Sequence, residues 1–234
     1  MNSGPHPVVG IIGGMGPEAT VELMRRVVGR TAARDDADHL HLIVESNPKI
    51  PSRIAHLVER TGPDPTPELV RIARNLESAG ATLLAMPCNT AHGYASEIRA
   101  AVGIPLLDMV ELTVRQVTRA GSRTRVGLLA STAVHTTGIY GRAVAARGGS
   151  VVVPARQDAV MALIRAVKRG ETGHASRQAL EDLAVSLAEH ADTIVLACTE
   201  LSVIADRLKC PVPVVDALDV LTQAIISAAD GSTG

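Results

Sequence analysis

Two cysteines hold equivalent places in the sequence, and a thiol is one of the few side chains able to exchange protons near neutral pH. Cys88 lies in Met-Pro-Cys-Asn-Thr and Cys198 in Leu-Ala-Cys-Thr-Glu, an offset of 110 residues (88 to 198). Each follows an apolar run and precedes a helical pattern, and a helix N-terminus favours the thiolate. We therefore expect both thiols to have a pKa below about 8.5. The alternative is that they are small buried core residues.

Two thiols on opposite sides of one cleft suit a particular reaction. One removes a proton from a carbon centre and the other delivers a proton to the opposite face, which inverts the stereocentre. This chemistry demands no cofactor. The sequence has no Cys/His cluster at zinc spacing, so it predicts no metal.

A glycine-rich loop, Gly13–Thr20, follows the first predicted strand and opens the first predicted helix. Such a loop can hold an anion. Its residues Gly14–Ala19 formally satisfy the dinucleotide pattern G-x-G-x-x-G/A, and Glu45 ends the second strand, where a ribose-binding acid would stand. A nucleotide site is thus a competing interpretation, although it explains neither cysteine, and a plain tight turn is a third.

Short β-branched runs alternate with segments of helical period, which is typical of an α/β fold with helices on both faces of a parallel sheet. The predicted strands are Val8–Ile12, Leu40–Glu45, Thr82–Met86, Pro105–Leu107, Arg125–Ala130, Ser150–Val153, Thr193–Ala197 and Val212–Val215. The predicted helices are Pro17–Thr31, Pro67–Ser78, Ala91–Ala101, Met109–Thr118, Gly138–Arg147, Asp158–Lys168, Ala175–His190 and Asp216–Ala229.

Two further pairs repeat in the same order as the cysteines. Val9–Gly13 is matched by Val126–Ala130, an offset of 117 residues (9 to 126), and Pro105–Asp108 by Pro213–Asp216, an offset of 108 (105 to 213). Chance likeness between apolar strands is the alternative. We expect two similar α/β domains, residues 1–117 with Cys88 and residues 118–234 with Cys198, and allow for a crossover of the C-terminal helix.

Composition excludes several classes of protein. Lys and Arg number 23 against 24 Asp and Glu, with no basic cluster to neutralise nucleic-acid phosphates. Phe and Trp are absent, so bases have no stacking platform. No apolar stretch approaches the roughly 20 residues that cross a bilayer. With three cysteines and no leader-like N-terminus, we expect a protein of the reducing cytoplasm.

Together the motifs resemble those of the cofactor-independent aspartate/glutamate racemase family, most closely its aspartate racemase branch. The resemblance runs from about Val8 to Ile226. It is carried by Gly13–Thr20, by Ser46–Arg53 (Ser-Asn-Pro-Lys-Ile-Pro-Ser-Arg), by Met86–His92 and by Ala197–Leu201. It implies two Rossmann-like domains related by a pseudo-twofold axis, with the active site in the cleft between them, and a homodimer.

The resemblance also implies roles for single residues. Cys88 and Cys198 match the two acid/base residues, Cys88 on the side of the D-enantiomer. Arg53 and Lys168 match residues at the side-chain carboxylate of the substrate, where a guanidinium can bind in a bidentate manner. The remaining matches line the pocket or hold the α-carboxylate and amino group: Met15, Asn89, Thr90, Ser131 and Thr199. The implied substrate is a small acidic amino acid, aspartate first and glutamate next.

The chain departs from the branch at three positions. Val134 lacks a hydroxyl that the branch usually has, and Ser52 and Ile54 replace the usual Asp and Thr beside Arg53. Selectivity can therefore have moved away from aspartate. An isomerase or decarboxylase for another dicarboxylic acid, and a binding protein without turnover, stay open as alternatives.

Two residues near these motifs receive other interpretations. His92 follows Cys88 by one helical turn, and we interpret it as a packed histidine, because a two-thiol mechanism needs no further base. Cys210 has no counterpart in the other half and is expected to be a bystander.

Overall fold

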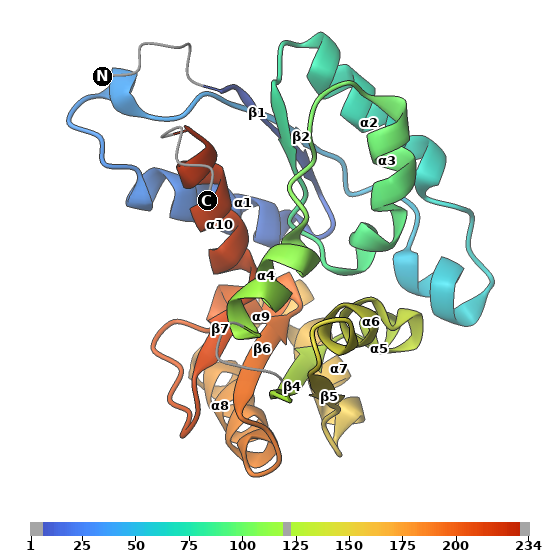
Figure 1. Ribbon diagram of the computed structural model, residues 1–234, viewed down its shortest axis with the longest axis vertical. Coiled ribbons are helices and arrows are strands. Elements are labelled where there is room, and N and C mark those ends of the chain that lie inside the picture. The colour runs from blue at the N-terminus through green and yellow to red at the C-terminus, as the bar shows by residue number, and fades with distance from the viewer. Residues whose placement is uncertain (1–6, 119–122, 230–234) are drawn as a thin grey trace.

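Two separate parallel sheets form the framework of the computed structural model, which describes residues 7–118 and 123–229. They lie in two lobes, one above the other (Figure 1). The upper sheet has the order β2-β1-β3, and the lower sheet the order β5-β4-β6-β7. The strands are β1 (Val9–Gly13), β2 (Leu42–Ser46), β3 (Leu83–Ala85), β4 (Arg125–Ala130), β5 (Ser150–Val152), β6 (Thr193–Ala197) and β7 (Val214–Asp216).

The two sheets share one topology, which confirms the predicted α/β fold with related halves. In both, the first strand of the half pairs with the second on one side and the third on the other. The predicted strand Pro105–Leu107 is reduced to a single parallel bridge from Leu106 to Leu84, in the place that β7 takes beside β6. The expectation of a full strand there was wrong. One bridge satisfies only part of a strand's backbone groups.

The long helices lie close to the predicted ranges. They are α1 (Pro17–Arg30), α2 (Thr66–Ser78), α3 (Ala95–Ala101), α4 (Met109–Val117), α6 (Ile139–Ala145), α7 (Gln157–Lys168), α8 (His174–Ala188) and α10 (Ala217–Ala229). The predicted helix Ala91–Ala101 is divided, since Thr90–Tyr94 forms a 3-10 turn before α3. Four short elements were not predicted: the 3-10 turn Asp36–Asp38, the π-helical segment Ala55–Glu59, α5 (Thr132–Thr137) and α9 (Thr199–Ile204).

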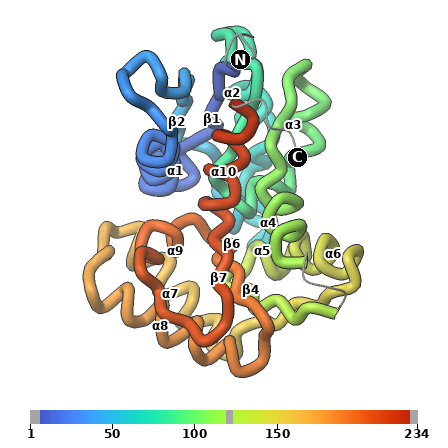
Figure 2. The backbone as a smooth tube through the Cα atoms, turned by 60° about the vertical axis from the view of Figure 1, so that its left-hand side comes forward, coloured from blue at the N-terminus to red at the C-terminus, as the bar shows by residue number. Residues whose placement is uncertain are grey.

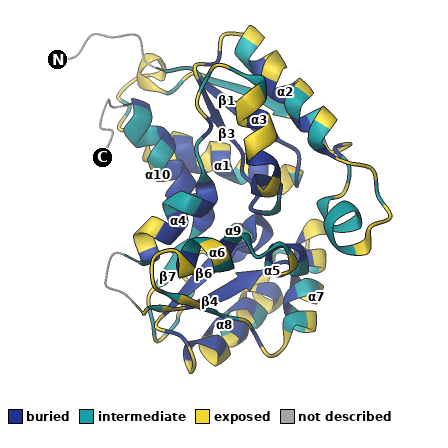
Figure 3. Cartoon of the chain, turned by 45° about the vertical axis from the view of Figure 1, so that its right-hand side comes forward, coloured by how far each residue is buried: buried dark blue, intermediate teal, exposed yellow. Residues whose placement is uncertain are grey.

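The central strands β1, β4 and β6 are buried along nearly their whole length and are dark blue in Figure 3, whereas the edge strands β2, β5 and β7 are partly exposed. In β1, Ile12 packs on one face, against α2, and Val9 and Ile11 pack on the other. A strand covered on both sides needs apolar residues at successive positions. This is why continuous apolar runs, and not alternating patterns, mark the strands in this sequence.

Each sheet is covered on one face by a helix from the other half of the chain. The C-terminal helix α10 packs through Leu218, Leu221 and Ile225 into the cluster that contains β1, and Figure 2 shows it lying beside β1 and α1. Helix α4 packs through Val110 and Val114 against the lower sheet. We call α4 and α10 the crossing helices. They join the lobes by two reciprocal contacts, α10 with the upper sheet and α4 with the lower sheet. The predicted domain boundary at residue 117 stays a prediction.

Among residues 7–118 and 123–229, no helix is long and apolar enough to span a lipid bilayer.

Candidate active site

A small cavity lies between the lobes and is lined by residues of both halves. Its volume is about 60 Å³, room for a few water molecules at roughly 10–15 Å³ each, or for a ligand of few atoms. The structure brings together there all nine residues singled out from the sequence: Met15, Arg53, Cys88, Asn89, Thr90, Ser131, Lys168, Cys198 and Thr199. Ser52, Ile54, Ile164, Ala197 and Glu200 complete the lining.

Each cysteine reaches the cavity because it stands at the carboxyl end of a strand in its own sheet, which is where open parallel sheets bind ligands. Cys198 directly follows β6, and Cys88 follows β3 after two residues. Their exposed fractions are 8% and 7%. Both strands are flanked by neighbours in their sheets, so the two cysteine turns are held from the inside of each lobe.

The glycine-rich loop forms another wall, through Met15. Gly14 has φ of +92°, and a Cβ there would lie 2.4 Å from the Asn47 backbone. Its N–H is taken by the Thr20 hydroxyl at 2.9 Å. Glu45, the proposed ribose ligand of the nucleotide interpretation, is instead bonded to Arg71 at 2.7 Å. The loop is therefore a tight turn against its neighbours, and its glycine is required by the close approach of two backbone segments.

Cys198 has an acidic neighbour. Its Sγ donates a hydrogen bond to Glu200 Oε2 at 3.0 Å, and Lys168 Nζ lies 3.3 Å from Glu200 Oε1. Burial and the Glu200 carboxylate raise the pKa of the Cys198 thiol well above its ordinary value, and Lys168 offsets this only in part. The predicted low pKa was wrong for Cys198. A helix of six residues has too weak a dipole to outweigh an adjacent carboxylate and burial.

Lys168 remains a cation in this setting. Burial works against its charge, but Glu200 and the two cysteines outweigh burial and raise the pKa of Lys168. Glu200 escaped the sequence analysis, although it stands two residues after Cys198. The sequence does contain a signal for Glu200, because the second residue after the cysteine differs between the halves: it is Thr90 after Cys88 and Glu200 after Cys198.

His92 is bonded to backbone on both sides of its ring. Nε2 accepts a hydrogen bond from Met109 N at 3.1 Å, so the proton lies on Nδ1, which donates to Cys88 O at 2.9 Å. Burial lowers the pKa of His92 and keeps the ring neutral. These contacts agree with a packed histidine and leave no nitrogen free to act as a base for the Cys88 thiol.

Two hydrogen-bond donors beside the cavity have no partner among the described residues. Asn89 Oδ1 accepts from Tyr140 OH at 2.6 Å, while Asn89 Nδ2 is buried and unpaired. Arg53 donates through Nη1 to Pro51 O at 3.0 Å, and its buried Nε is likewise unpaired. Unsatisfied buried donors are costly. Both residues line the cavity.

Hydroxyl groups connect the two halves at the cavity. Thr90 Oγ1 lies 3.3 Å from Ser131 Oγ, and Thr199 Oγ1 donates to Pro87 O at 3.1 Å. Their predicted contacts with the α-carboxylate and amino group stay predictions. The Thr199 hydroxyl is already bonded to the protein, so its remaining donor is the backbone N–H.

Charge favours an anionic ligand in this cavity. Arg53 and Lys168 are its two cations and Glu200 is its one carboxylate, which leaves one net positive charge. Moving a proton from Cys198 to Glu200 leaves this balance unchanged.

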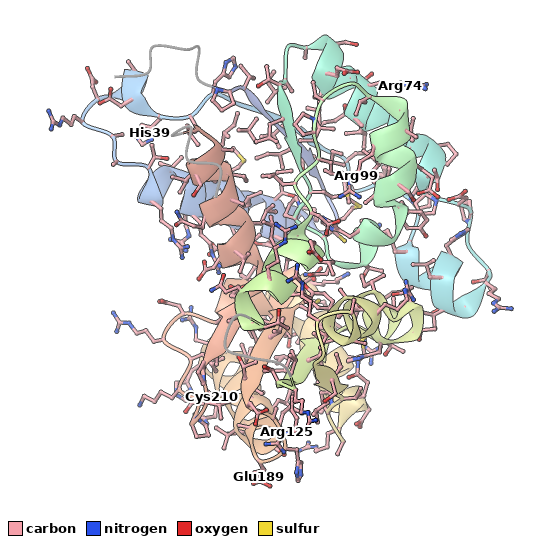
Figure 4. The ribbon with its side chains drawn as sticks, in the orientation of Figure 1. His39, Arg74, Arg99, Arg125, Glu189 and Cys210 are labelled. Carbon is pink, nitrogen blue, oxygen red and sulfur yellow. The ribbon has the colours of Figure 1, made fainter. Side chains whose placement is uncertain are left out.

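Two other observations concern residues outside this cavity. The described residues contain no group of three or more His, Cys, Asp or Glu side chains arranged to hold a metal ion. Cys210 lies towards the far end of the lower lobe, away from the level where the lobes meet (Figure 4). There its Sγ is 3.8 Å from Ala184 O.

Two α/β lobes with parallel sheets, meeting at a cavity flanked by two strand-end cysteines, define the class of this protein. Residues 12–225 match the model of the Asp/Glu/hydantoin racemase family, and the chain belongs to that family. This places it among the isomerases, and hence among enzymes.

Individual relatives agree with this assignment. The aspartate racemase of Picrophilus torridus is 33% identical, with a TM-score of 0.85 over 96% of this chain and 94% of its own. The broad specificity amino-acid racemase RacX of Bacillus subtilis is 28% identical over 94% of this chain and 97% of its own. Glutamate racemase RacE1 of Bacillus anthracis shares the fold, with 16% identity and a TM-score of 0.64 over 97% of this chain and 84% of its own.

Proposed function

We propose that the chain interconverts L- and D-aspartate, or glutamate, by moving protons between Cα and the thiols of Cys88 and Cys198. One observation carries this proposal: the two cysteines come from equivalent strand ends of the two halves and line the same cavity. The similarity to an aspartate racemase supports the choice of substrate. The net positive charge of the cavity suits a substrate with one net negative charge.

The proposed reaction consists of three proton transfers. Glu200 takes the proton of the Cys198 thiol, to which it is hydrogen bonded, and leaves a thiolate. That thiolate removes the α-proton from one face of the amino acid, so a Cα–H bond breaks and an S–H bond forms. Cys88 donates its thiol proton to the opposite face and becomes the thiolate. The reverse reaction begins from that state, and only side chains of this protein take part.

Donors beside the cavity would hold the substrate. Arg53, with its unpaired Nε, and Lys168 would bind the side-chain carboxylate, and Asn89 Nδ2 would bind the α-carboxylate. Electrostatic attraction in a buried site is stronger than in water, which helps to stabilise the carbanion-like state that forms at Cα. Because both thiols must be reduced, we place the protein in the cytoplasm.

The test is isotope exchange with inversion. Incubation with L-aspartate in D₂O should yield D-aspartate deuterated at Cα. Proton NMR measures the loss of the Cα proton, and chiral chromatography measures the D-enantiomer. Cys88→Ala and Cys198→Ala should each abolish inversion. Cys210→Ala is the matched control and should keep full activity, because Cys210 lies outside the cavity. If inversion persists in the Cys88→Ala variant or in the Cys198→Ala variant, the proposal is wrong.

A second candidate is a racemase that accepts a wider range of amino acids. Three observations favour it: Ser52 and Ile54 stand beside Arg53 in the cavity wall, Lys168 is already paired with Glu200, and RacX is a relative of broad specificity. A panel of acidic, neutral and basic L-amino acids separates the two candidates. Comparable rates across the panel favour the broad enzyme, and gas evolution from a dicarboxylic acid would instead indicate a decarboxylase.

A further inference from the structure

Each cysteine turn is tied to the start of a crossing helix by the residue four positions later. After Cys88 this residue is His92, and after Cys198 it is Ser202. His92 accepts from Met109 N, the first residue of α4. Ser202 Oγ donates to Asp216 Oδ1 at 2.6 Å, directly before α10. Each half therefore connects its cysteine turn to the start of a crossing helix by a hydrogen bond, but the two halves use different side chains.

The tie in the second half has an additional member, which comes from the other lobe. Arg26 belongs to α1, packed against the upper sheet, and is only 8% exposed. Its Nη1 donates to Asp216 Oδ2 at 2.6 Å and its Nη2 donates to Ser202 O at 2.6 Å. Its remaining ion pairs, at 2.6 and 2.5 Å, are with Glu22 and Asp219.

The guanidinium thus holds two groups of the lower lobe at once, the main chain of α9 and the carboxylate before α10. Among the amino acids, only arginine has a planar group with several N–H donors that can bind two acceptors at once. Asp216 is fully occupied in return, since its Oδ1 also accepts from Leu218 N at 2.9 Å. A buried pair in which every atom is bonded has one geometry, and so fixes the groups that it joins.

Helix α9 transmits this geometry to the cavity. It has six residues, with Cys198 at its N-cap and Glu200 in its first turn. Ser202 lies four residues from Cys198, which corresponds to about 6 Å along the axis at 1.5 Å per residue. A single helical turn is too short to bend, so a shift at Ser202 O moves Glu200 and Cys198 with it.

We propose that Arg26 is a positioning residue for Cys198 and Glu200, which sets their place in the cavity by holding Ser202 and Asp216 from the opposite lobe. Its effect on turnover rests on the two-thiol function proposed above. Its effect on the placement of the Cys198 thiol does not.

The decisive variant is Arg26→Lys. Lysine keeps the buried positive charge beside Asp216, so the fold is retained, but one ammonium cannot reach both Asp216 Oδ2 and Ser202 O in the same way. We expect kcat to fall by about 10- to 100-fold, as for a displacement of about 1 Å at a reacting group. KM should be nearly unchanged, because Arg26 does not line the cavity. Ser202→Ala should give a smaller loss of the same kind.

Arg30→Lys is the matched control. Arg30 lies one turn further along α1, is more exposed, and is bonded to Asp219 without reaching Ser202. It should keep the wild-type kcat. The second readout is labelling by iodoacetamide, with the rate at each cysteine measured by mass spectrometry of its peptide. In Arg26→Lys and Ser202→Ala, the ratio of Cys198 labelling to Cys88 labelling should change severalfold.

Two results would overturn this role for Arg26. One is a folded Arg26→Lys protein with the wild-type kcat and labelling ratio. The other is a uniform increase in labelling of all three cysteines with a lower Tm, which is the signature of general destabilisation. If the wild-type protein does not racemise aspartate or any other amino acid, the proposed function fails, while the labelling ratio still decides whether Arg26 positions Cys198.

Discussion

Replacement of Glu200 by glutamine separates the reactivity of the Cys198 thiol from turnover. The carboxylate lies 3.0 Å from Sγ and raises the pKa of Cys198. At 3.0 Å, the repulsion between carboxylate and thiolate is about 1.4 kcal/mol at the dielectric constant of water and about 5.5 kcal/mol at an effective value of 20. The smaller figure already corresponds to about a tenfold change in an equilibrium constant. Glu200→Gln should therefore increase the thiolate fraction at least about tenfold.

The assay uses a protein in which Cys198 is the only cysteine, made by Cys88→Ala and Cys210→Ala. Alkylation by iodoacetamide at about pH 8, near the ordinary thiol pKa, should be faster with Glu200→Gln. It should be slower with Lys168→Met, which removes the cation that favours the thiolate. Glu189→Gln, at the far end of the same lobe (Figure 4), is the charge-matched control and should change nothing.

The rate of racemisation should fall in Glu200→Gln, whereas the rate of alkylation should rise. In the otherwise wild-type chain, Glu200→Gln should lower kcat although the thiol is more reactive, because the proton acceptor for Cys198 is gone. Alkylation that is unchanged or slower in Glu200→Gln would refute the electrostatic account. Unchanged kcat would refute the role of Glu200 as proton acceptor.

Four further outcomes are expected. Tyr140→Phe removes the hydroxyl that donates to Asn89 Oδ1 and should lower the free energy of unfolding by about 1–3 kcal/mol in urea titrations. Gly14→Ala should lower Tm more than Gly80→Ala, because both positions have positive φ but only at Gly14 would a Cβ meet backbone. Asp108→Asn concerns acid stability: burial opposes the charge, but hydrogen bonds from the α4 N-terminus and an arginine lower the pKa of the carboxyl. Its stabilisation is complete above about pH 4 and is lost as pH falls through the lowered pKa, so wild type and variant should converge in stability at low pH. Sedimentation velocity should give roughly twice the mass of one chain, as the homodimer implied by the resemblance requires.

Sequence patterns were informative for elements long enough to show a period. Strands such as β4 and helices such as α7 were predicted nearly to the residue, because burial on both sheet faces dictates continuous apolar runs. Helices α5 and α9 have six residues each, which is fewer than two turns, so no amphipathic period can develop in them. The bridge at Leu106 was predicted as a strand from a short apolar run, a pattern too brief to tell a single bridge from a full strand.

The candidate site was predictable in its location and less so in its electrostatics. Cys88 and Cys198 meet at one cavity because both end parallel strands, a consequence of topology that sequence repeats reveal. The raised pKa of Cys198 depends instead on burial and on a side-chain contact with Glu200. Neither the rotamer of Glu200 nor the depth of the cavity is encoded in residue spacing, so the sequence predicted the wrong direction.

The reciprocal placement of α4 and α10 bears on how the chain can be divided. A cut after residue 118 would leave α4 attached to the upper sheet, which it does not cover, and α10 attached to the lower sheet. Each fragment would expose an apolar face that its sister fragment is built to shield. The two fragments should therefore associate into a soluble complex when they are co-expressed, whereas each fragment expressed alone should precipitate. The same exchange makes this protein a natural candidate for a split reporter, in which reassembly is read out by recovered turnover.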